Sequence, residues 1–323
     1  MKSGAALNCC DSLIVVASRS FSSDPHLRER LLARFPQAKF NLLRDRLSRE
    51  EFIDWLIPAE AVIVGLDRVD GALLDQCKHL KVIAKYGVGL DNIDLESCHA
   101  RGIAVRWTGG VNRLSVAEQT VGFMIAMCRN LYQSSILMKS GEWAKSGGFQ
   151  LSGKCVGIIG VGHIGKEVVR LLMPFRCRIL VNDIVDQKDY YTQNGIIEST
   201  KDEIFRDADI VTIHTSLNED TYHLVNQRTL AMMKPTSFLI NTSRGVVIHQ
   251  DDLKEALVNK AIAGAALDVF ESEPPSDQAL LNLPNLFCTP HIGGNAREAV
   301  RAMGMSAIQH LESFYGFEGE SGT

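Results

Sequence analysis

Short apolar runs alternate with segments of helical periodicity along almost the whole chain. Strands that alternate with helices in this way pair in parallel and carry helices on both faces, so the pattern predicts the α/β class. In the first third of the chain, the expected strands are 12–17, 39–43, 61–64, 82–84 and 103–105, and the expected helices are 25–35, 48–56, 70–78 and 95–101. We expect these segments to form one small α/β domain.

The same alternation returns after a turn-rich stretch, Thr108 to Asn112, which is a candidate hinge. A long helical segment, 116–138, comes next, and the capping-box pair Ser115 and Glu118 predicts its start. This helix can pack on its own domain or face a second subunit, and its periodicity fits both. Further strands are expected at 156–159, 179–181, 210–214, 238–240, 263–267 and 286–288, and further helices at 166–173, 227–233, 251–259 and 297–314. The pattern alone assigns the closing helix, 297–314, to this second domain.

A glycine-rich turn follows the apolar run 156–159 and opens a helical segment, and the next strand ends in Asp183. Gly160 permits a tight turn, Gly162 lets a pyrophosphate approach the backbone, and Gly165 allows the helix to pack close to the strand. Free N–H groups at the helix start attract the phosphates. A carboxylate at Asp183 accepts hydrogen bonds from ribose hydroxyls and repels a 2′-phosphate, which predicts NAD rather than NADP. The alternative is an ordinary glycine-rich turn.

Composition excludes several classes of protein. The chain has 323 residues, of which 46% are hydrophobic and 22% charged, and its net charge of −4 gives no basic excess for nucleic acid or anionic lipid. No apolar run is long enough to span a membrane, and the first ten residues lack the regions of a signal peptide. The eight cysteines show no spacing typical of metal ligands. We therefore expect a cytoplasmic protein without structural disulfides or a bound metal.

Three ionisable residues come directly after three successive expected strands: Arg244, Glu273 and His291. Ligands of an open parallel sheet bind beyond the carboxyl ends of its strands, where the glycine-rich turn also lies. Arginine can bind a substrate carboxylate with two hydrogen bonds and polarise a carbonyl group. Histidine can exchange a hydroxyl proton, and a neighbouring carboxylate favours its imidazolium form and fixes the ring. Each residue alone fits a solvated or structural role, but together they predict hydride transfer between NAD and a hydroxy acid.

Five segments, in this order, resemble the D-isomer-specific 2-hydroxyacid dehydrogenases, and most closely their D-3-phosphoglycerate dehydrogenase branch. The segments are 86–94 (YGVGLDNID), 160–165 (GVGHIG), 241–245 (NTSRG), 267–274 (LDVFESEP) and 289–294 (TPHIGG). The resemblance spans nearly the whole chain. It implies that Arg244, Glu273 and His291 form the catalytic set and that the protein is a homodimer built on the NAD-binding domains.

The resemblance also implies a domain arrangement and two sets of binding residues. A Rossmann NAD-binding domain, 108–295, would be inserted in a smaller flavodoxin-like substrate domain, 1–107 with 296–323, which includes the closing helix. Backbone N–H groups of Gly87, Val88 and Gly89 would bind the substrate carboxylate. The implied NAD contacts are Gly160, Gly162, His163, Ile164, Gly165, Asp183, Thr215, Thr242, Ser243, Asp268, Gly293 and Gly294.

Two departures from the family pattern are visible. Ser216 stands where the family usually has proline, which concerns the rigidity of one loop and not the fold. The sequence also ends soon after the closing helix, so we expect neither the regulatory C-terminal domains of some phosphoglycerate dehydrogenases nor feedback by serine through them.

The substrate is open from the sequence. Four basic residues, Arg19, Arg68, Lys85 and Arg106, lie at strand ends of the first domain, and Arg113 lies near the hinge. They are either solvated or bind a second anionic group. The second reading favours D-3-phosphoglycerate, with Arg68 and Lys85 as phosphate ligands, and a role in serine synthesis.

Other functions stay open beside this one. The nearer alternatives are a glyoxylate, hydroxypyruvate or D-lactate type of reductase, and less directly a formate or phosphite dehydrogenase. A protein of another class, a transcriptional corepressor that senses NAD with the same fold, can keep the catalytic triad. For an enzyme, we expect the two domains to close over the substrate at hinges near Gly109 and Asn295.

Overall fold

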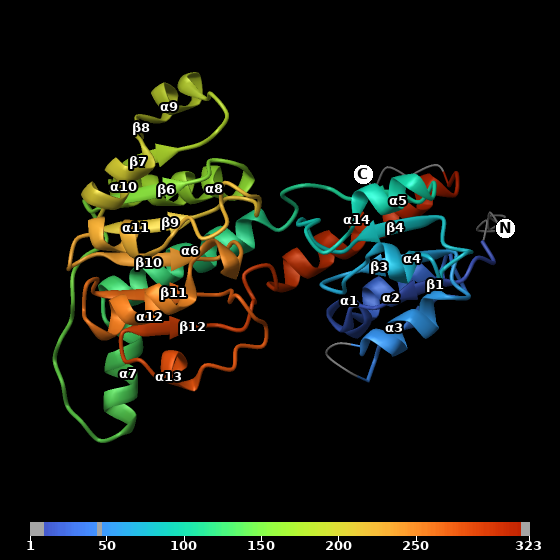
Figure 1. Cartoon of the computed structure of the whole chain (residues 1–323), viewed down its shortest axis with the longest axis horizontal. Coiled ribbons are helices and arrows are strands. Elements are labelled where there is room, and N and C mark those ends of the chain that lie inside the picture. The colour runs from blue at the N-terminus through green and yellow to red at the C-terminus, as the bar shows by residue number, and fades with distance from the viewer. Residues whose placement is uncertain (1–9, 44–46, 318–323) are drawn as a thin grey trace, which may run out of the picture. The chain divides into compact units, whose positions relative to one another are not determined.

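The computed structural model describes residues 10–43 and 47–317, and Figure 1 shows its helices and strands. The chain divides into two compact units, which we describe separately. The first unit contains the residues up to Asn112 together with those from Asn295 onward, and the second unit is Arg113–Gly294. No helix in the described ranges is both long and apolar enough to cross a membrane.

The first unit contains a five-stranded sheet in the order β2-β1-β3-β4-β5, and every strand pair in it is parallel. This order is the flavodoxin-like form of a doubly wound sheet. Its strands are β1 (Ile14–Val16), β2 (Lys39–Phe40), β3 (Ala61–Val64), β4 (Val82–Lys85) and β5 (Ala104–Arg106). The sequence prediction of these strands is therefore confirmed, with ends that differ by a few residues.

Helices cover both faces of the first sheet. Two separate apolar clusters fill the spaces between sheet and helices, one formed with α3, α4 and α5 and the other with α1, α2 and α14. The helices are α1 (Arg19–Ser23), α2 (Pro25–Leu32), α3 (Arg49–Leu56), α4 (Gly71–Leu74), α5 (Leu95–Ala100) and α14 (Arg297–Phe314). The closing helix α14 thus belongs to the first unit, as the family resemblance implied and the periodicity alone did not.

Helix α14 is held to α2 by a close apolar contact and by a buried ion pair. A Cβ on Gly304 of α14 would overlap the side chain of Leu27 in α2, so glycine allows the two helices to approach. The carboxylate of Glu312 lies 2.7 Å from Arg30 Nη2 and 3.4 Å from Arg34 Nε, and its side chain is only 6% exposed. Removal of one partner of such a buried pair leaves the other charge without compensation, so these contacts stabilise the packing of α14 against α2.

The second unit contains a seven-stranded sheet in the order β12-β11-β10-β9-β6-β7-β8, again with every pair parallel. The chain reverses its direction of strand addition between β6 and β9, as in Rossmann folds. The strands are β6 (Cys155–Ile159), β7 (Arg178–Asn182), β8 (Ile197–Glu198), β9 (Ile210–Ile213), β10 (Phe238–Asn241), β11 (Gly264–Leu267) and β12 (Leu286–Cys288). The prediction of two doubly wound parallel-sheet folds is confirmed.

Helices also cover both faces of the second sheet. Helices α6 and α8 supply the apolar side chains of one cluster, and α10, α11 and α12 supply those of the other. The helices of this unit are α6 (Arg113–Cys128), α7 (Leu131–Lys139), α8 (His163–Leu172), α9 (Lys188–Asn194), α10 (Lys201–Asp207), α11 (Gln227–Met232), α12 (Gln250–Val258) and α13 (Gln278–Leu281). Two 3₁₀ turns, η1 (Met173–Phe175) and η2 (Gly245–Val247), complete it.

The long helix expected over 116–138 is two helices, so that prediction is wrong in one respect. Asn130 between α6 and α7 has a left-handed backbone with φ 52°, which ends a helix and which asparagine tolerates better than most residues. The prediction of a capping box at Ser115 and Glu118 is also wrong, because α6 begins at Arg113, before both residues. Helix α6 packs on its own unit through residues such as Val121 and Met124, whereas α7 buries no residue.

Several short elements were not predicted from the sequence, namely α1, α9, β8, α10 and α13. Only α10 carried a clear signal, because Thr200 and Glu203 form a capping box in which each side chain binds the other residue's backbone N–H.

Candidate active site

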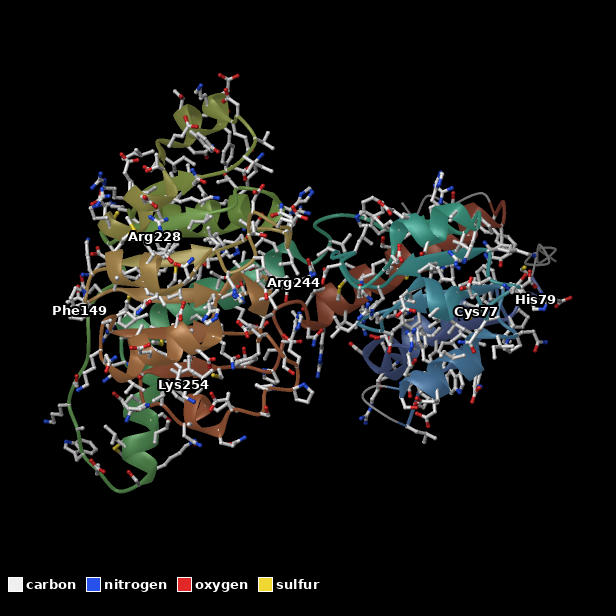
Figure 2. The ribbon with its side chains drawn as sticks, in the orientation of Figure 1. Cys77, His79, Phe149, Arg228, Arg244 and Lys254 are labelled. Carbon is white, nitrogen blue, oxygen red and sulfur yellow. The ribbon has the colours of Figure 1, made fainter. Side chains whose placement is uncertain are left out.

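The three predicted catalytic residues lie at the carboxyl ends of neighbouring strands in the second unit. Arg244 follows β10, Glu273 follows β11 and His291 follows β12, and these strands are adjacent in the sheet. Figure 2 labels Arg244 in its loop. Because all strands are parallel, the loops after them share one edge of the sheet.

His291 and Glu273 are directly hydrogen-bonded, with 2.7 Å between Nδ1 and Oε2. Burial raises the pKa of the Glu273 carboxyl, but the hydrogen bond and charge of His291, a hydrogen bond from the Phe270 N–H and the charge of Arg244 together hold the pKa below its usual value. The carboxylate is therefore ionised at neutral pH and can only accept, so Nδ1 of His291 carries a proton. The other ring nitrogen, Nε2, remains for chemistry.

The loop that carries Arg244 is fixed by buried polar groups. Asn241, at the end of β10, is fully buried; its amide donates to the Arg244 carbonyl at 2.8 Å and its oxygen accepts from the Ser243 N–H and hydroxyl. Gly245 packs so closely on the backbone of Phe270 that a Cβ would overlap the Phe270 carbonyl. Glycine at this position therefore allows the Arg244 loop and the Glu273 loop to touch.

Asp268 holds the loop that carries His291. Its side chain is buried and accepts hydrogen bonds from the Thr289 hydroxyl at 2.5 Å, the Ile292 N–H at 2.9 Å and the Gly293 N–H at 2.7 Å. His291 has a left-handed backbone, with φ 54°, which this network maintains. Asp268 was predicted to contact NAD, and these contacts give its carboxylate a role within the chain as well.

Helix α6 adds two supports that the sequence did not reveal. Gln119 donates to the Thr289 hydroxyl at 2.8 Å, and Ser115 donates to the Gly293 carbonyl at 2.5 Å. Gln119 is 170 residues and Ser115 is 178 residues away in sequence from its partner, so no local pattern could have found these bonds.

The three motif glycines lie where β6 turns into α8. Gly160 has φ 96°, and a Cβ there would lie 2.6 Å from the His214 carbonyl, so the turn requires glycine. A Cβ on Gly165 would overlap the Gly160 carbonyl. Gly162, by contrast, faces open space, with no atom of the described chain within 4 Å of a built Cβ. Gly162 therefore leaves room for a ligand, whereas the other two allow close packing of the chain.

The start of helix α8 has the features of a phosphate site. Its first residues are His163 and Ile164, and no side chain caps them at Gly162. The first N–H groups of a helix attract anions when no acceptor in the chain takes them.

Two of the predicted NAD contacts, Asp183 and Thr215, lie at the same edge. Asp183, after β7, accepts from the Val161 N–H at 2.5 Å and the Val185 N–H at 2.9 Å and is half-buried. After β9, the Thr215 hydroxyl and His214 Nδ1 are buried without a partner in the described part of the chain. Burial lowers the pKa of His214 to about 3, so its ring is neutral at physiological pH. Orphaned polar atoms of this kind fit a polar ligand.

The other predicted cofactor residues surround this edge. Thr242 and Ser243 are buried; the Thr242 hydroxyl lies 3.0 Å from that of Thr120 in α6, and the Ser243 hydroxyl donates to Asn241. Gly293 is buried and Gly294 is half-buried beside Asp268. Open space at Gly162, an uncapped helix start and unpartnered polar atoms together fit a dinucleotide.

The basic residues of the first unit have different environments. The Lys85 side chain is buried at the end of β4, where its ammonium donates to the Gly65 carbonyl at 2.5 Å and to Asn92 Oδ1 at 2.6 Å. The Arg68 side chain is 79% exposed and lies 3.4 Å from Asp70. Gly87 has φ 126°, which requires glycine, and Val88 and Gly89 follow it at half-buried positions.

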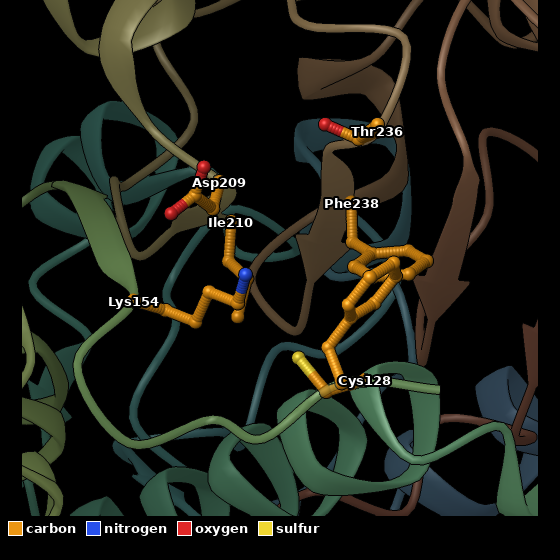
Figure 3. Close-up of a pocket in the computed structure, with 7 residues that line it drawn as sticks. Cys128, Lys154, Asp209, Ile210, Thr236 and Phe238 are labelled. Carbon is orange, nitrogen blue, oxygen red and sulfur yellow. The ribbon is translucent and has the colours of Figure 1, made fainter. Parts of the chain in front are cut away.

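A cavity of about 120 Å³ in the second unit lies at the opposite edge of its sheet (Figure 3). Its lining includes Lys154, Asp209 and Phe238, which lie at the amino ends of β6, β9 and β10. Asp209 is already paired with Lys234 Nζ at 2.9 Å and with the Cys155 N–H. The cavity contains none of the predicted catalytic residues, so we do not assign the site to it.

Comparison with known proteins identifies the family. Residues 121–293 match the family model described as D-isomer specific 2-hydroxyacid dehydrogenase, NAD binding domain. The chain belongs to this family of NAD-dependent oxidoreductases. NAD is accordingly its cofactor, as the sequence predicted.

Curated relatives have different substrates in their names. A hydroxypyruvate reductase from Thermotoga maritima is 32% identical over 90% of this chain and 95% of its own length. A glyoxylate reductase from Thermofilum pendens is 38% identical over 82% of this chain and 80% of its own length. A D-3-phosphoglycerate dehydrogenase from Methanocaldococcus jannaschii is 36% identical over 82% of this chain, which spans only 52% of that protein.

Solved structures share the whole fold. One example is a crystal structure, from Polaromonas sp. JS6 66, titled as a putative D-isomer specific 2-hydroxyacid dehydrogenase. It has a TM-score of 0.87 and 28% sequence identity, and the match covers 97% of this chain and 99% of that one.

Replacement of Gly162 by alanine tests the cofactor site separately from the fold. Because a Cβ at Gly162 meets no atom of the described chain, we expect Gly162→Ala to keep the melting temperature of the wild type. A pyrophosphate over this backbone would be displaced, and we expect the dissociation constant for NADH to rise roughly tenfold, a loss of about 1.4 kcal/mol. Fluorescence titration with NADH measures this constant.

The matched control is Gly165→Ala, whose Cβ overlaps the Gly160 carbonyl and should lower stability. Unchanged NADH affinity in Gly162→Ala would contradict the assignment of this turn to the pyrophosphate.

Proposed function

We propose that this chain interconverts a D-2-hydroxy acid and the corresponding 2-oxo acid, and that its substrate pair is D-3-phosphoglycerate and 3-phosphohydroxypyruvate. The observation that carries the chemistry is the hydrogen-bonded pair His291–Glu273, near Arg244 and on the same sheet edge as the glycine-rich turn. A histidine with one nitrogen fixed and the other available is suited to proton exchange with a substrate hydroxyl.

The residues of the second unit divide the chemical work. When bound, NADH supplies the hydride that the carbonyl carbon of the 2-oxo acid receives. His291 donates the proton from Nε2 to the carbonyl oxygen in reduction and accepts it from the hydroxyl in oxidation. Glu273 stabilises the positive charge on the ring while it holds the proton. Arg244 binds the substrate carboxylate and polarises the carbonyl group.

Residues of the first unit are assigned to the rest of the substrate. Gly87, Val88 and Gly89 form a loop whose positive φ at Gly87 suits it to present backbone N–H groups to the carboxylate. The Arg68 guanidinium is mostly exposed and is assigned to the phosphate. The buried Lys85 ammonium, at the end of β4, binds Gly65, which follows β3, and Asn92. We therefore propose that Lys85 supplies a fixed positive charge at this edge of the sheet and is not a direct phosphate ligand.

A reductase for glyoxylate or hydroxypyruvate is the second candidate. The contacts that engage the Lys85 ammonium within the chain favour it, because they leave fewer of its N–H donors for a phosphate. The names of the relatives include both candidates and do not decide between them.

We also propose a homodimer that uses α7 and the loop after it. Figure 1 shows α7 and this loop projecting from the second unit. Their apolar side chains are widely exposed, and a patch of this kind marks an interface. The exposed fractions are 53% for Leu131, 42% for Ile136, 54% for Met138, 74% for Trp143 and 54% for Phe149.

The cytoplasm is the compartment that we propose. The seven cysteines of the described ranges have free thiols. Burial raises the pKa of Cys98, Cys128 and Cys288 to about 11, which keeps these groups protonated and unreactive.

Oxidation of NADH by a panel of 2-oxo acids tests the proposed function. We expect turnover with phosphohydroxypyruvate to exceed that with hydroxypyruvate, glyoxylate, pyruvate and 2-oxoglutarate. His291→Asn keeps a residue that tolerates the left-handed backbone but removes the proton carrier, so kcat should fall by about 10²–10⁴ while NADH still binds. Arg68→Ala should raise KM for phosphohydroxypyruvate and leave KM for glyoxylate unchanged.

Three other outcomes are informative. A preference for glyoxylate or hydroxypyruvate would select the second candidate. Unchanged KM values in Arg68→Ala would remove this residue from the substrate site. Binding of NADH without turnover on any 2-oxo acid would contradict the enzyme and revive the NAD-sensing binding protein.

Sedimentation analysis of charged variants tests the dimer. We expect the wild type to be dimeric and the double variant Ile136→Lys, Met138→Lys to be monomeric, because buried lysines oppose association. The control is Val258→Lys, which adds a charge at a residue that is 58% exposed elsewhere in the second unit. A double variant that stays dimeric would show that α7 is not the interface.

A further inference from the structure

A second histidine–carboxylate pair, His223 and Glu271, lies in the loops beside the catalytic residues. His223 Nε2 is 3.1 Å from Glu271 Oε1, and the side chains are 25% and 32% exposed. The same carboxylate oxygen accepts the Gln250 N–H, at the start of α12, at 2.9 Å. One carboxylate therefore connects three segments that are far apart in sequence.

The backbone of His223 is held in place by further contacts. It has a left-handed conformation with φ 50°, and its N–H donates to the Val246 carbonyl at 2.9 Å. Its ring stacks on Tyr222 at 4.0 Å between centroids and meets the edge of His249 at 4.6 Å. A left-handed backbone at a residue other than glycine is kept only where its surroundings determine it, which is typical of functional sites.

Four titratable groups face the His223 ring or its neighbours. They are Glu271, Tyr222, His249 and, through a 3.1 Å contact with His249 Nδ1, Asp252. These groups do not form a metal site: among the described residues, no set of three His, Cys, Asp or Glu side chains could hold a metal ion. We therefore infer a role other than metal binding for this cluster.

Glu271 lies in the turn that presents Glu273. The Phe270 N–H donates to Glu273 Oε1 at 3.1 Å, so the turn and the catalytic carboxylate form one small unit. The backbone of Phe270 and Glu271 in this turn packs on Gly245, the residue after Arg244. A Cβ on Gly245 would overlap the Phe270 carbonyl and the Glu271 nitrogen. The His223 N–H binds the Val246 carbonyl, which lies one residue after Gly245.

We propose that Glu271 is a positioning residue: its bonds to His223 and Gln250 fix the turn that holds Glu273 against His291. The inference rests on the proposed function only for its effect on rate. An exposed ion pair contributes little to stability, so the bridge should matter for geometry more than for unfolding. A misplacement of the order of 1 Å in a catalytic group lowers the rate markedly.

Kinetics of two Glu271 variants and one His223 variant test the rate. We expect Glu271→Ala to lower kcat roughly tenfold, with KM for NADH unchanged. Glu271→Gln keeps an oxygen that can accept from Gln250 and His223, and should restore kcat to within about threefold of the wild type. His223→Asn tolerates the left-handed backbone but is too short to reach Glu271, and should behave like Glu271→Ala.

Proton NMR of the His291–Glu273 hydrogen bond provides a test that needs no substrate. In the wild type, the proton on His291 Nδ1 is shielded from solvent exchange by its bond to Glu273 and should give a downfield signal. In Glu271→Ala this signal should broaden or vanish, and the titration of the Glu273 carboxyl should move upward, toward its ordinary value, since the contacts that lower its pKa are loosened. Glu271→Gln should retain both wild-type properties.

The control is Arg228→Gln. Arg228, which Figure 2 labels, forms an exposed ion pair with Asp202 in the same unit, and its replacement should change neither kcat nor the NMR signal. An unaltered NMR signal and Glu273 titration in Glu271→Ala would overturn the proposal. A kcat that falls only as the folded fraction falls, or that Glu271→Gln does not rescue, would also overturn it. If the enzyme lacks activity, the NMR result still decides, so the two failures are distinguishable.

Discussion

Parallel strand pairing is the constraint on which the candidate site depends. In the second unit, all seven strands run in the same direction, so the loops after them meet at one edge of the sheet. The glycine-rich turn after β6, Asp183 after β7 and Thr215 after β9 lie on one half of this edge. Arg244, Glu273 and His291 follow β10, β11 and β12 on the other half. A single reversed strand would move its loop, with the candidate catalytic residue on it, to the opposite edge.

The proposed catalytic pair, His291 and Glu273, is supported by carboxylates that act within the chain. Asp268 holds the His291 loop through three hydrogen bonds, and Glu271 connects the Glu273 turn to His223 and α12. Both histidines have left-handed backbones, which such networks maintain. These contacts restrain the loops in the absence of substrate. The conformational entropy of the loops is therefore lost on folding rather than during the reaction.

Much of this arrangement could be predicted from the sequence because its causes are local. Apolar runs mark β6 and β10, Gly160 and Gly165 mark a turn that only glycine permits, and order along the chain places Arg244, Glu273 and His291 after successive strands. The break at Asn130 was missed because the apolar periodicity continues through it, and one residue's backbone conformation decides it. The bonds from Gln119 to Thr289 and from His223 to Glu271 could not be predicted, because they join residues distant in sequence. Lys85 was expected among phosphate ligands, but burial and two internal acceptors were invisible in the sequence.

The central claim is that the His291–Glu273 pair and Arg244 act on a D-2-hydroxy acid beside the NAD site. The most direct measurement is the initial rate of NAD reduction with the separate D and L enantiomers of 3-phosphoglycerate, glycerate and lactate. The account predicts turnover with D enantiomers alone, because Arg244 and His291 fix the carboxylate and the hydroxyl relative to one face of the cofactor. Equal rates with both enantiomers, or turnover with the L forms alone, would contradict it.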